Sequence, residues 1–301
     1  MTNTICLDKN YSTTRLLTQD KPVIINNPGD KFETVLFLPE GEGRKGEGGL
    51  RAKGYFKRSF EGKPLISIVT VVFNGEKYLE ETIQSVINQT YDNVEYIIID
   101  GGSTDGTMGI IKKYEHAIDY WVSEKDNGIY HAMNKGLSLA IGDYIALLNC
   151  GDWYELDACE IISIDIKKSH YDVYYGIIRV FDNNIFRNIS GSTVNNLNKS
   201  MIAHPTCFIS RKIYSQFRYN AIYRTSGDYD LIIRLSKSEK SFYLIERILA
   251  NFRLGGISCS YLGLIESAKI KRKYKFISFK KYILLIINAY LSRFYNLINH
   301  A

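Results

Sequence analysis

The stretch from Pro64 to Thr107 constrains the fold more than any other part of this chain. It reads PLISIVTVVFNGEKYLEETIQSVINQTYDNVEYIIIDGGSTDGT. Its first run, Ile66 to Phe73, is almost wholly β-branched or aromatic, which is typical of a strand covered on both faces. A second apolar run, Val94 to Ile99, predicts another strand. Between the two, apolar residues recur at the three-and-four spacing of an amphipathic helix: Tyr78, Leu79, Ile83, Val86 and Ile87. This order predicts a right-handed βαβ unit and therefore an α/β fold.

The second predicted strand leads directly into a glycine-rich turn, Asp100-Gly101-Gly102-Ser103-Thr104-Asp105. Open parallel sheets bind ligands at the carboxyl ends of their strands. Glycines leave the backbone open to close approach, and a carboxylate accepts a hydrogen bond from the imide of a pyrimidine. We therefore expect a nucleotide at this turn. Asp105 is expected to cap a helix over residues 107–114.

Length and composition are those of an enzyme-sized globular protein. The 301 residues are 45% hydrophobic, which is enough to bury one large core. Five cysteines lack metal-ligand spacing, which argues against structural zinc and favours reduced thiols in the cytosol. Residues 1–10 lack a signal-peptide pattern, and no apolar run reaches the roughly 20 residues that span a bilayer. We expect a cytoplasmic location.

The chain divides into three zones. Residues 1–63 form a polar extension in which Gly41 to Gly49 is too rich in glycine for a regular element, so a loop or lid is expected. A disordered leader is the alternative, although residues 34–38 could add a short strand. Residues 64–259 form the main body, with further strands expected over residues 171–180 and 201–210, the latter being the last.

Residues 260–301 predict a basic amphipathic helical tail. Seven basic residues occur there without an intervening acid, just before the apolar run 282–287: Lys269, Lys271, Arg272, Lys273, Lys275, Lys280 and Lys281. Such a tail suits an anionic membrane surface. The alternative is a helix packed on the body with a solvated basic face.

Three more motif blocks follow the glycine-rich turn. They are Ser123 to Gly136, reading SEKDNGIYHAMNKG; Gly142 to Asp152, reading GDYIALLNCGD; and Thr225 to Leu235, reading TSGDYDLIIRL. Together with Val71-Val72-Phe73-Asn74 and the turn, these blocks resemble family 2 glycosyltransferases of the A-type fold. That family is inverting, depends on nucleotide sugars and occurs in bacterial surface-polysaccharide biosynthesis. The resemblance covers Ile66 to about Ile257.

The resemblance implies a Rossmann-like, mostly parallel central sheet flanked by helices, with 64–259 as the catalytic domain. It also implies a nucleotide-sugar donor, expected to be UDP-linked, whose base hydrogen-bonds Asp100. The positions expected to contact this donor are Val72, Asn74, Asp100, Gly102, Ser103, Asp126, Gly128, Asn134, Asn149 and His204.

The block ending at Asp152 departs from the family pattern. Relatives place several carboxylates there to hold a divalent cation, but this chain has Asn149 and Gly151 and keeps only Asp152. One carboxylate and a diphosphate suffice for Mg²⁺ or Mn²⁺, so we expect a weakly held cation with Asp152 as its ligand. A metal-free mechanism with basic side chains is the alternative.

The last block implies the general base. Inversion requires a base on the face opposite the leaving diphosphate, and the motif register assigns that role to Asp228. Asp230 is expected to cap the helix that begins there.

The expected acceptor is a lipid-linked saccharide at the inner face of the cytoplasmic membrane, as in O-antigen, capsule or exopolysaccharide assembly. A non-catalytic relative that only binds sugar nucleotides is the alternative. No glycine fingerprint follows the first strand, which argues against a dinucleotide-dependent oxidoreductase. The basic residues cluster at one end without interleaved aromatics, which argues against a nucleic-acid partner.

Overall fold

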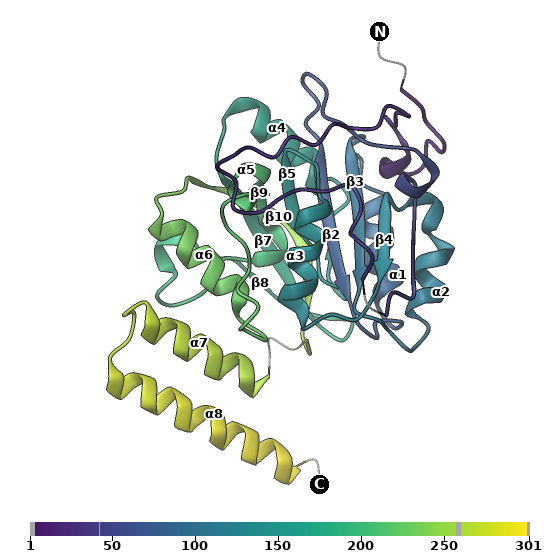
Figure 1. Ribbon diagram of the computed structural model, residues 1–301. Helices are drawn as coiled ribbons and strands as arrows, with labels where there is room; N and C mark the ends of the chain where they lie inside the picture. The colour runs from purple at the N-terminus through teal and green to yellow at the C-terminus, as the bar shows by residue number, and fades with distance from the viewer. Residues whose placement is uncertain (1–3, 42, 257–259, 300–301) are drawn as a thin grey trace.

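The structure, a computed structural model, describes residues 4–41, 43–256 and 260–299. Its described strands form a 10-stranded sheet in the order β1-β4-β3-β2-β5-β9-β7-β10-β6, with β8 paired to β7 (Figure 1). The strands are β1 Gly46–Gly48, β2 Ile66–Val72, β3 Val94–Asp100, β4 Tyr120–Ser123, β5 Tyr144–Leu147, β6 Trp153–Tyr154, β7 Val173–Asp182, β8 Ile185–Ser190, β9 Phe208–Ser210 and β10 Phe242–Arg253.

The predicted βαβ unit is present. β2 and β3 pair in parallel with Val72 opposite Asp100, so both strands end at the same level. β4 and β5 extend this parallel core on either side. Beyond β5 the sheet is mixed, because β9 runs antiparallel to both β5 and β7. The parallel character expected from the sequence therefore holds for β4-β3-β2-β5 and for the pair β7 and β10.

Helices cover both faces of the sheet (Figure 1). One apolar core joins the sheet to α1, α2 and α4, and a second joins its other face to α3, α5, α6 and α7. The buried stripe predicted for the first helix is confirmed at Leu79, Ile83, Val86 and Ile87. The helices are α1 Leu79–Ile87, α2 Thr107–Lys113, α3 Ile129–Leu139, α4 Ala158–Lys168, α5 Arg211–Tyr214, α6 Gly227–Lys237, α7 Tyr261–Lys273 and α8 Phe279–Asn299.

The glycine-rich part of the N-terminal extension forms a strand, contrary to expectation. β1 pairs antiparallel with β4 and becomes an edge of the sheet. A Cβ at Gly48 would lie 2.8 Å from Nε1 of Trp121, so glycine is what allows this strand to lie against the indole. Residues 34–38 form no strand in the structure. Val35 instead donates its N–H to the carbonyl of Ser138 at 2.7 Å.

Buried charges anchor the extension to the body. Arg51 pairs with Glu95 at 2.5 Å, and both side chains are at most 1% exposed. Arg51 also donates to the carbonyls of Leu36 at 3.0 Å and Leu139 at 2.9 Å. The described part of the extension is therefore packed on the sheet and is not a disordered leader.

Two strand predictions need correction. The strand expected over 171–180 is present as β7, but the segment 201–210 is a strand only at its end. His204–Thr206 form a 3₁₀ turn with Pro205 inside it, and only Phe208–Ser210 pair as β9. Proline fixes φ and has no N–H to donate, which disfavours a ladder at that point. The last strand is β10, which has an irregular burial pattern and was not predicted.

The C-terminal region is helical, as predicted for residues 260–301, in α7 and α8. None of the described helices combines the length and the apolarity needed to cross a bilayer.

Candidate active site

Four loops meet at one edge of the parallel core. They follow β2, β3, β4 and β5 directly and comprise residues 73–75, 101–106, 124–128 and 149–152. Parallel strands bring their carboxyl ends to the same edge, where such sheets bind ligands. The motif blocks therefore lie where the sequence predicted them.

Asp100 organises the turn after β3. Its carboxylate is fully buried, and Oδ2 accepts from the N–H of Gly102 at 3.2 Å, the N–H of Ser103 at 3.0 Å and Oγ of Ser123 at 2.5 Å. Oδ1 accepts from Oγ of Ser103. A carboxylate has about two acceptor positions on each oxygen, so Oδ2 is fully used, whereas Oδ1 accepts one hydrogen bond and keeps one position. The expected contact between Asp100 and a base stays a prediction.

Asn74 ties the turn after β2 to the turn after β3. It adopts a left-handed backbone with φ of 51°, which asparagine tolerates better than most residues. Its N–H donates to Oγ of Ser103 at 2.7 Å, and its Oδ1 accepts from the N–H of Thr104 at 2.9 Å. Val72 is buried and contributes its carbonyl, which accepts from the N–H of Gly101 at 2.9 Å. These contacts shape the turn before any ligand arrives.

Phe73 is a site residue that the sequence analysis left inside the strand. It lies just beyond β2 and is 65% exposed. A Cβ at Gly101 would be 3.4 Å from the Phe73 ring and 2.5 Å from Oδ2 of Asp126. The glycine therefore allows an aromatic ring and a carboxylate to close over the turn. An aromatic residue directly after a strand, next to a glycine turn, was the available signal.

Asp105 does not occupy the predicted N-cap position of α2, which is Gly106, but its carboxylate accepts from the first residue of the helix. It accepts from the N–H of Thr107 at 3.1 Å and also from the N–H of Glu76 at 3.1 Å. Although partial burial opposes it, the Thr107 hydroxyl and these N–H groups lower the pKa of Asp105.

Asp228 lies in the first turn of α6 beside Tyr130 of α3. Its Oδ1 accepts from the hydroxyl of Tyr130 at 3.1 Å and from the N–H of Tyr229 at 2.9 Å. Burial raises the pKa of Tyr130, so this hydroxyl remains a donor. A Cβ at Gly227 would lie 2.8 Å from the Tyr130 ring. Glycine at this position, where relatives often have glutamate, is thus what lets the tyrosine reach the aspartate.

His204 belongs to the layer behind Asp228. Its Nε2 hydrogen-bonds the hydroxyl of Tyr219 at 2.8 Å, and the Tyr219 ring stacks on Tyr130 at 5.5 Å. Burial lowers the pKa of His204, although the Asp228 charge opposes the shift. The imidazole is therefore neutral at physiological pH and supports the tyrosines around the base.

Asn134 has a structural task that differs from the predicted donor contact. Its Nδ2 donates to the carbonyl of Tyr219 at 2.8 Å, and its Oδ1 accepts from the N–H of the same residue at 3.0 Å. Both ends of the amide are used in holding the loop that carries Tyr219.

Residues 126–130 link the glycine-rich turn to the candidate base. At one end Asp126 leans over Gly101 and accepts from the N–H of Gly128 at 2.8 Å. At the other end Tyr130 donates to Asp228. Gly128 has φ of 109°, a conformation that favours glycine, and allows the sharp entry into α3.

Asp230 is not a helix cap, contrary to expectation. It is fully buried and accepts from Nε of Arg234 at 2.8 Å, Nζ of Lys273 at 2.8 Å and the hydroxyl of Tyr274 at 2.9 Å. Burial alone would raise the pKa of Asp230, but these partners bring it below the usual value. The residue joins α6 to the end of α7.

Glu266 of α7 binds the backbone of the loop that precedes α6. Its carboxylate accepts from the N–H groups of Arg224 and Thr225 at 2.8 Å and of Ser226 at 3.0 Å, and from the Thr225 hydroxyl at 2.8 Å. Although burial opposes it, these bonds lower the pKa of Glu266. The sequence analysis missed this residue because it lies in the segment assigned to the tail.

The loop after β5 offers oxygen atoms for a cation. Asp152 is 4% exposed and accepts from the N–H of Arg253 at 3.1 Å, and burial raises the pKa of Asp152 to about 7. Oδ1 of Asn149 is buried and has no hydrogen-bond partner. No group of three His, Cys, Asp or Glu side chains suited to a metal ion occurs among the described residues. The residues thus fit a hard cation that takes most of its ligands from a phosphate and water.

Comparisons with known proteins agree with this geometry. A chondroitin synthase from Escherichia coli is 29% identical over 188 residues, which cover 58% of this chain and 27% of that protein. The putative teichuronic acid biosynthesis glycosyltransferase TuaG of Bacillus subtilis is 39% identical over 101 residues, 33% of this chain and 40% of TuaG. The chain thus spans less than half the length of either relative.

A solved structure shares the fold. The crystal structure of S. aureus TarS 1–349 in complex with UDP-GlcNAc aligns with a TM-score of 0.57 over 76% of this chain and 73% of TarS 1–349, at 15% identity. The sheet flanked by helices is therefore the glycosyltransferase A-type fold that the sequence predicted.

The family model described as glycosyl transferase family 2 matches residues 67–231, more than half of the 301-residue chain. The matched range includes the glycine-rich turn, the loop after β5 and Asp228. On that match, this chain belongs to glycosyl transferase family 2.

Proposed function

We propose that the chain transfers a sugar from a UDP-sugar to a hydroxyl group of a saccharide acceptor with inversion of configuration. The observation that carries this proposal is the link through residues 126–130. One end of this segment touches the glycine-rich turn through Asp126, and the other end hydrogen-bonds Asp228 through Tyr130. The glycine-rich turn and the candidate base therefore lie at the two ends of one short segment.

The proposed reaction is a single displacement. Asp228 removes the proton of the acceptor hydroxyl as its oxygen forms a bond to the anomeric carbon, and the bond from that carbon to the diphosphate breaks. UDP leaves with the electron pair of that bond. Tyr130 donates to Oδ1 of Asp228 and orients the carboxylate, so Oδ2 is the oxygen assigned to the proton.

The donor is proposed to lie along the glycine-rich turn. Phe73 and Asp126 offer a ring face and a carboxylate for the base, beside the backbone of Gly102 and Ser103. Asn149 and Asp152 would hold Mg²⁺ or Mn²⁺ together with the donor diphosphate, and the cation would neutralise charge on the leaving group. UDP as the nucleotide is supported by the UDP-GlcNAc bound to the fold neighbour TarS.

The acceptor is proposed to be a lipid-linked saccharide of bacterial surface-polysaccharide assembly, met at the inner face of the cytoplasmic membrane. The names of two relatives, a chondroitin synthase and a teichuronic acid glycosyltransferase, support a polysaccharide product. α8 exposes apolar side chains next to lysines, and no acid follows Glu266 in the sequence. This combination suits an anionic bilayer surface. The exposed apolar residues of α8 are Phe279, Ile283, Leu284, Ile287, Tyr290 and Leu291.

Titration calorimetry with a panel of sugar nucleotides, with and without Mg²⁺ or Mn²⁺, tests the proposal. We expect binding of UDP-sugars and UDP, tightened by the cation, and weaker or no binding of GDP- and CMP-sugars. NMR of the product of transfer then reports the anomeric configuration. A protein that binds none of these nucleotides, or a product that retains the donor configuration, would contradict the proposal.

A further inference from the structure

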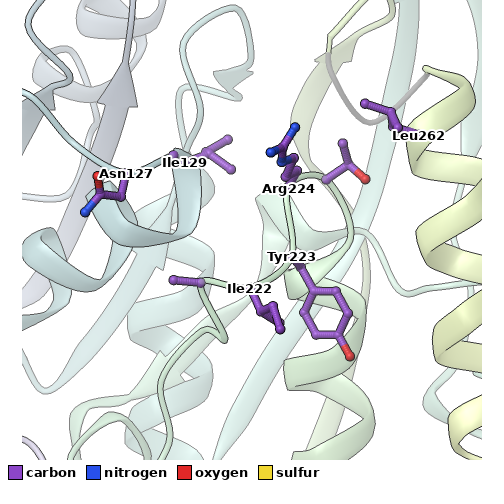
Figure 2. A pocket seen from close by; sticks show the side chains of 9 residues that line it. Asn127, Ile129, Ile222, Tyr223, Arg224 and Leu262 are labelled. Atoms are coloured by element: carbon purple, nitrogen blue, oxygen red, sulfur yellow. The ribbon is translucent and has the colours of Figure 1, made fainter.

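A pocket of about 540 Å³ is lined by segments that adjoin Tyr130 and Asp228 in the sequence, and its lining includes no residue of the glycine-rich turn. Three segments line it: residues 127–129 at the start of α3, the loop 221–225 before α6, and Leu262 of α7 (Figure 2). Ile129 precedes the tyrosine that donates to Asp228, and Thr225 lies three positions before Asp228. Two walls of the pocket thus belong to the segments that carry Tyr130 and Asp228.

The walls of the pocket are mainly apolar, with one cation among them. Ile129, Ile222 and Leu262 supply aliphatic surface. Figure 2 shows the guanidinium of Arg224 extending into the space between Ile129 and Leu262. In the described ranges no carboxylate pairs with this guanidinium. Among the described residues, the hydrogen bond that Arg224 makes is from its backbone N–H to Glu266.

A guanidinium of this kind suits an anionic ligand. Arginine stays charged and donates two parallel hydrogen bonds to a phosphate or a carboxylate. In the part of the chain that the structure describes, no side chain pairs with the guanidinium, which leaves its donors available to a ligand.

The loop that carries Arg224 is held from outside the catalytic body. Glu266 accepts three consecutive backbone N–H groups, from residues 224, 225 and 226. These bonds fix the backbone from which the guanidinium extends. They also connect the pocket to α7, whose Leu262 forms one of its walls.

We propose that this pocket binds an anionic group of the acceptor, with Arg224 as the recognition residue and Glu266 as a positioning residue that acts through the loop. The inference rests on the proposed transfer to a saccharide. Two groups share the required chemistry: the diphosphate that links a saccharide to its lipid, and the carboxylate of an acidic sugar.

The test measures binding of two probes to the full chain, with UDP and Mg²⁺ saturating the donor site. Geranyl diphosphate represents the lipid diphosphate and glucuronate the sugar carboxylate, while geraniol is the neutral control. We expect Arg224→Gln to weaken one of the charged probes by about tenfold or more, as for the loss of a charge-assisted hydrogen bond. Arg224→Lys should keep part of the affinity. Arg247→Gln, on the exposed side chain of another arginine, should change nothing.

The probe that responds to Arg224→Gln identifies which of the two groups the pocket takes. The proposal is overturned if neither probe binds the parent, if the variant binds both as well as the parent does, or if it loses affinity for UDP. The last result would assign Arg224 to the donor. A parent that fails to bind UDP but binds a charged probe through Arg224 contradicts the proposed transfer and leaves the anion site standing.

A separate measurement tests Glu266 as a positioning residue. Glu266→Ala should weaken the responding probe severalfold at unchanged UDP affinity, and Glu266→Gln, which keeps one acceptor oxygen, should recover part of the loss. Equal loss in both variants, or loss of UDP binding as well, would remove Glu266 as a positioning residue for this pocket.

Discussion

The N-terminal extension and the C-terminal helices were both expected to be appendages, yet each supports a different end of the candidate site. At the donor end, Nζ of Lys45 donates to the carbonyls of Gly102 at 2.7 Å and Ser103 at 3.0 Å. At the base end, Glu266 holds the loop before α6. Lys45 and Glu266 both lie outside residues 64–259, the range expected to form the catalytic domain.

The two segments differ in how they are attached. The extension adds an edge strand and the buried pair of Arg51 with Glu95, so it is part of the global fold. α7 is attached through Asp230, Glu266 and the buried Ile270, whereas α8 leaves much of its apolar surface exposed. The extension is therefore integral to the fold, because it buries both charges of the ion pair that joins it to the body.

We expect the largest effect from Asp228→Asn. This variant tests whether Asp228 acts in the chemical step without contributing to donor binding. Amide nitrogen cannot accept the acceptor proton, so turnover should fall by about 10²- to 10⁴-fold. UDP affinity measured by calorimetry should match that of the parent. Transfer at the parent rate would show that Asp228 is not the base.

The next largest effect tests whether the extension is integral. Arg51→Met leaves Glu95 buried without its partner and should lower the free energy of unfolding by about 3–5 kcal/mol. Denaturant unfolding measures this loss. Arg51→Met combined with Glu95→Gln should recover much of the loss, while Arg247→Met on the surface serves as the control. A single variant as stable as the parent would show that the extension is only loosely attached.

Two truncations compare α7 with α8. Removal of residues 279–301 should weaken sedimentation with phosphatidylglycerol vesicles by about tenfold or more, because it removes Lys280, Lys281 and the exposed apolar residues. UDP binding and turnover on a water-soluble acceptor should persist. Removal of residues 261–301 should also reduce turnover, because Glu266 goes with it.

If the shorter truncation binds the vesicles as well as the full chain does, α8 is not the membrane contact. If the longer truncation keeps full turnover, α7 does not support the base end.

A smaller effect is expected at the donor end. Lys45→Gln removes the ammonium that bonds the two carbonyls of the turn and should weaken UDP binding by roughly twofold to tenfold. Lys53→Gln, on an exposed lysine of the same extension, is the matched control. Identical UDP affinities in the two variants would mean that Lys45 does not stabilise the turn for the donor.

The smallest effect concerns pH at the base end. The pKa of Glu266 is lowered in the folded chain, so its carboxylate stabilises the fold above the free value of 4.5, and this contribution is lost as the pH falls below that value. The difference in melting temperature between the parent and Glu266→Gln should therefore be largest at neutral pH and shrink in acid. A difference that stays constant with pH would mean that the charge of Glu266 contributes no stability.

The parallel core was predictable because its signals are local. β-branched runs, a helical stripe and a glycine-rich turn act over a few residues each, and they predicted β2, α1 and β3 to within one or two positions. β1 was missed because glycine usually breaks strands. Here the missing side chains make room for Trp121, which lies far along the chain.

The candidate site was predictable only in part. Motif register led to Asp228, Asp152 and the turn at Asp100, all of which follow or flank predicted elements. The tasks of Asn134, His204 and Asp230 differ from expectation because each side chain is used by a distant partner. Glu266 and Arg224 belong to none of the motif blocks.

By itself, the sequence determined the α/β class, the edge of the sheet at which the motif blocks gather and membership of the family, since periodicity and motif order are written in neighbouring residues. Only the tertiary structure decided which carboxylates are used within their own turn, as at Asp100, and which hold the loop before the candidate base, as at Glu266. The physical reason is that a hydrogen bond depends on distance in space: Glu266 reaches a loop about 40 residues away in the chain.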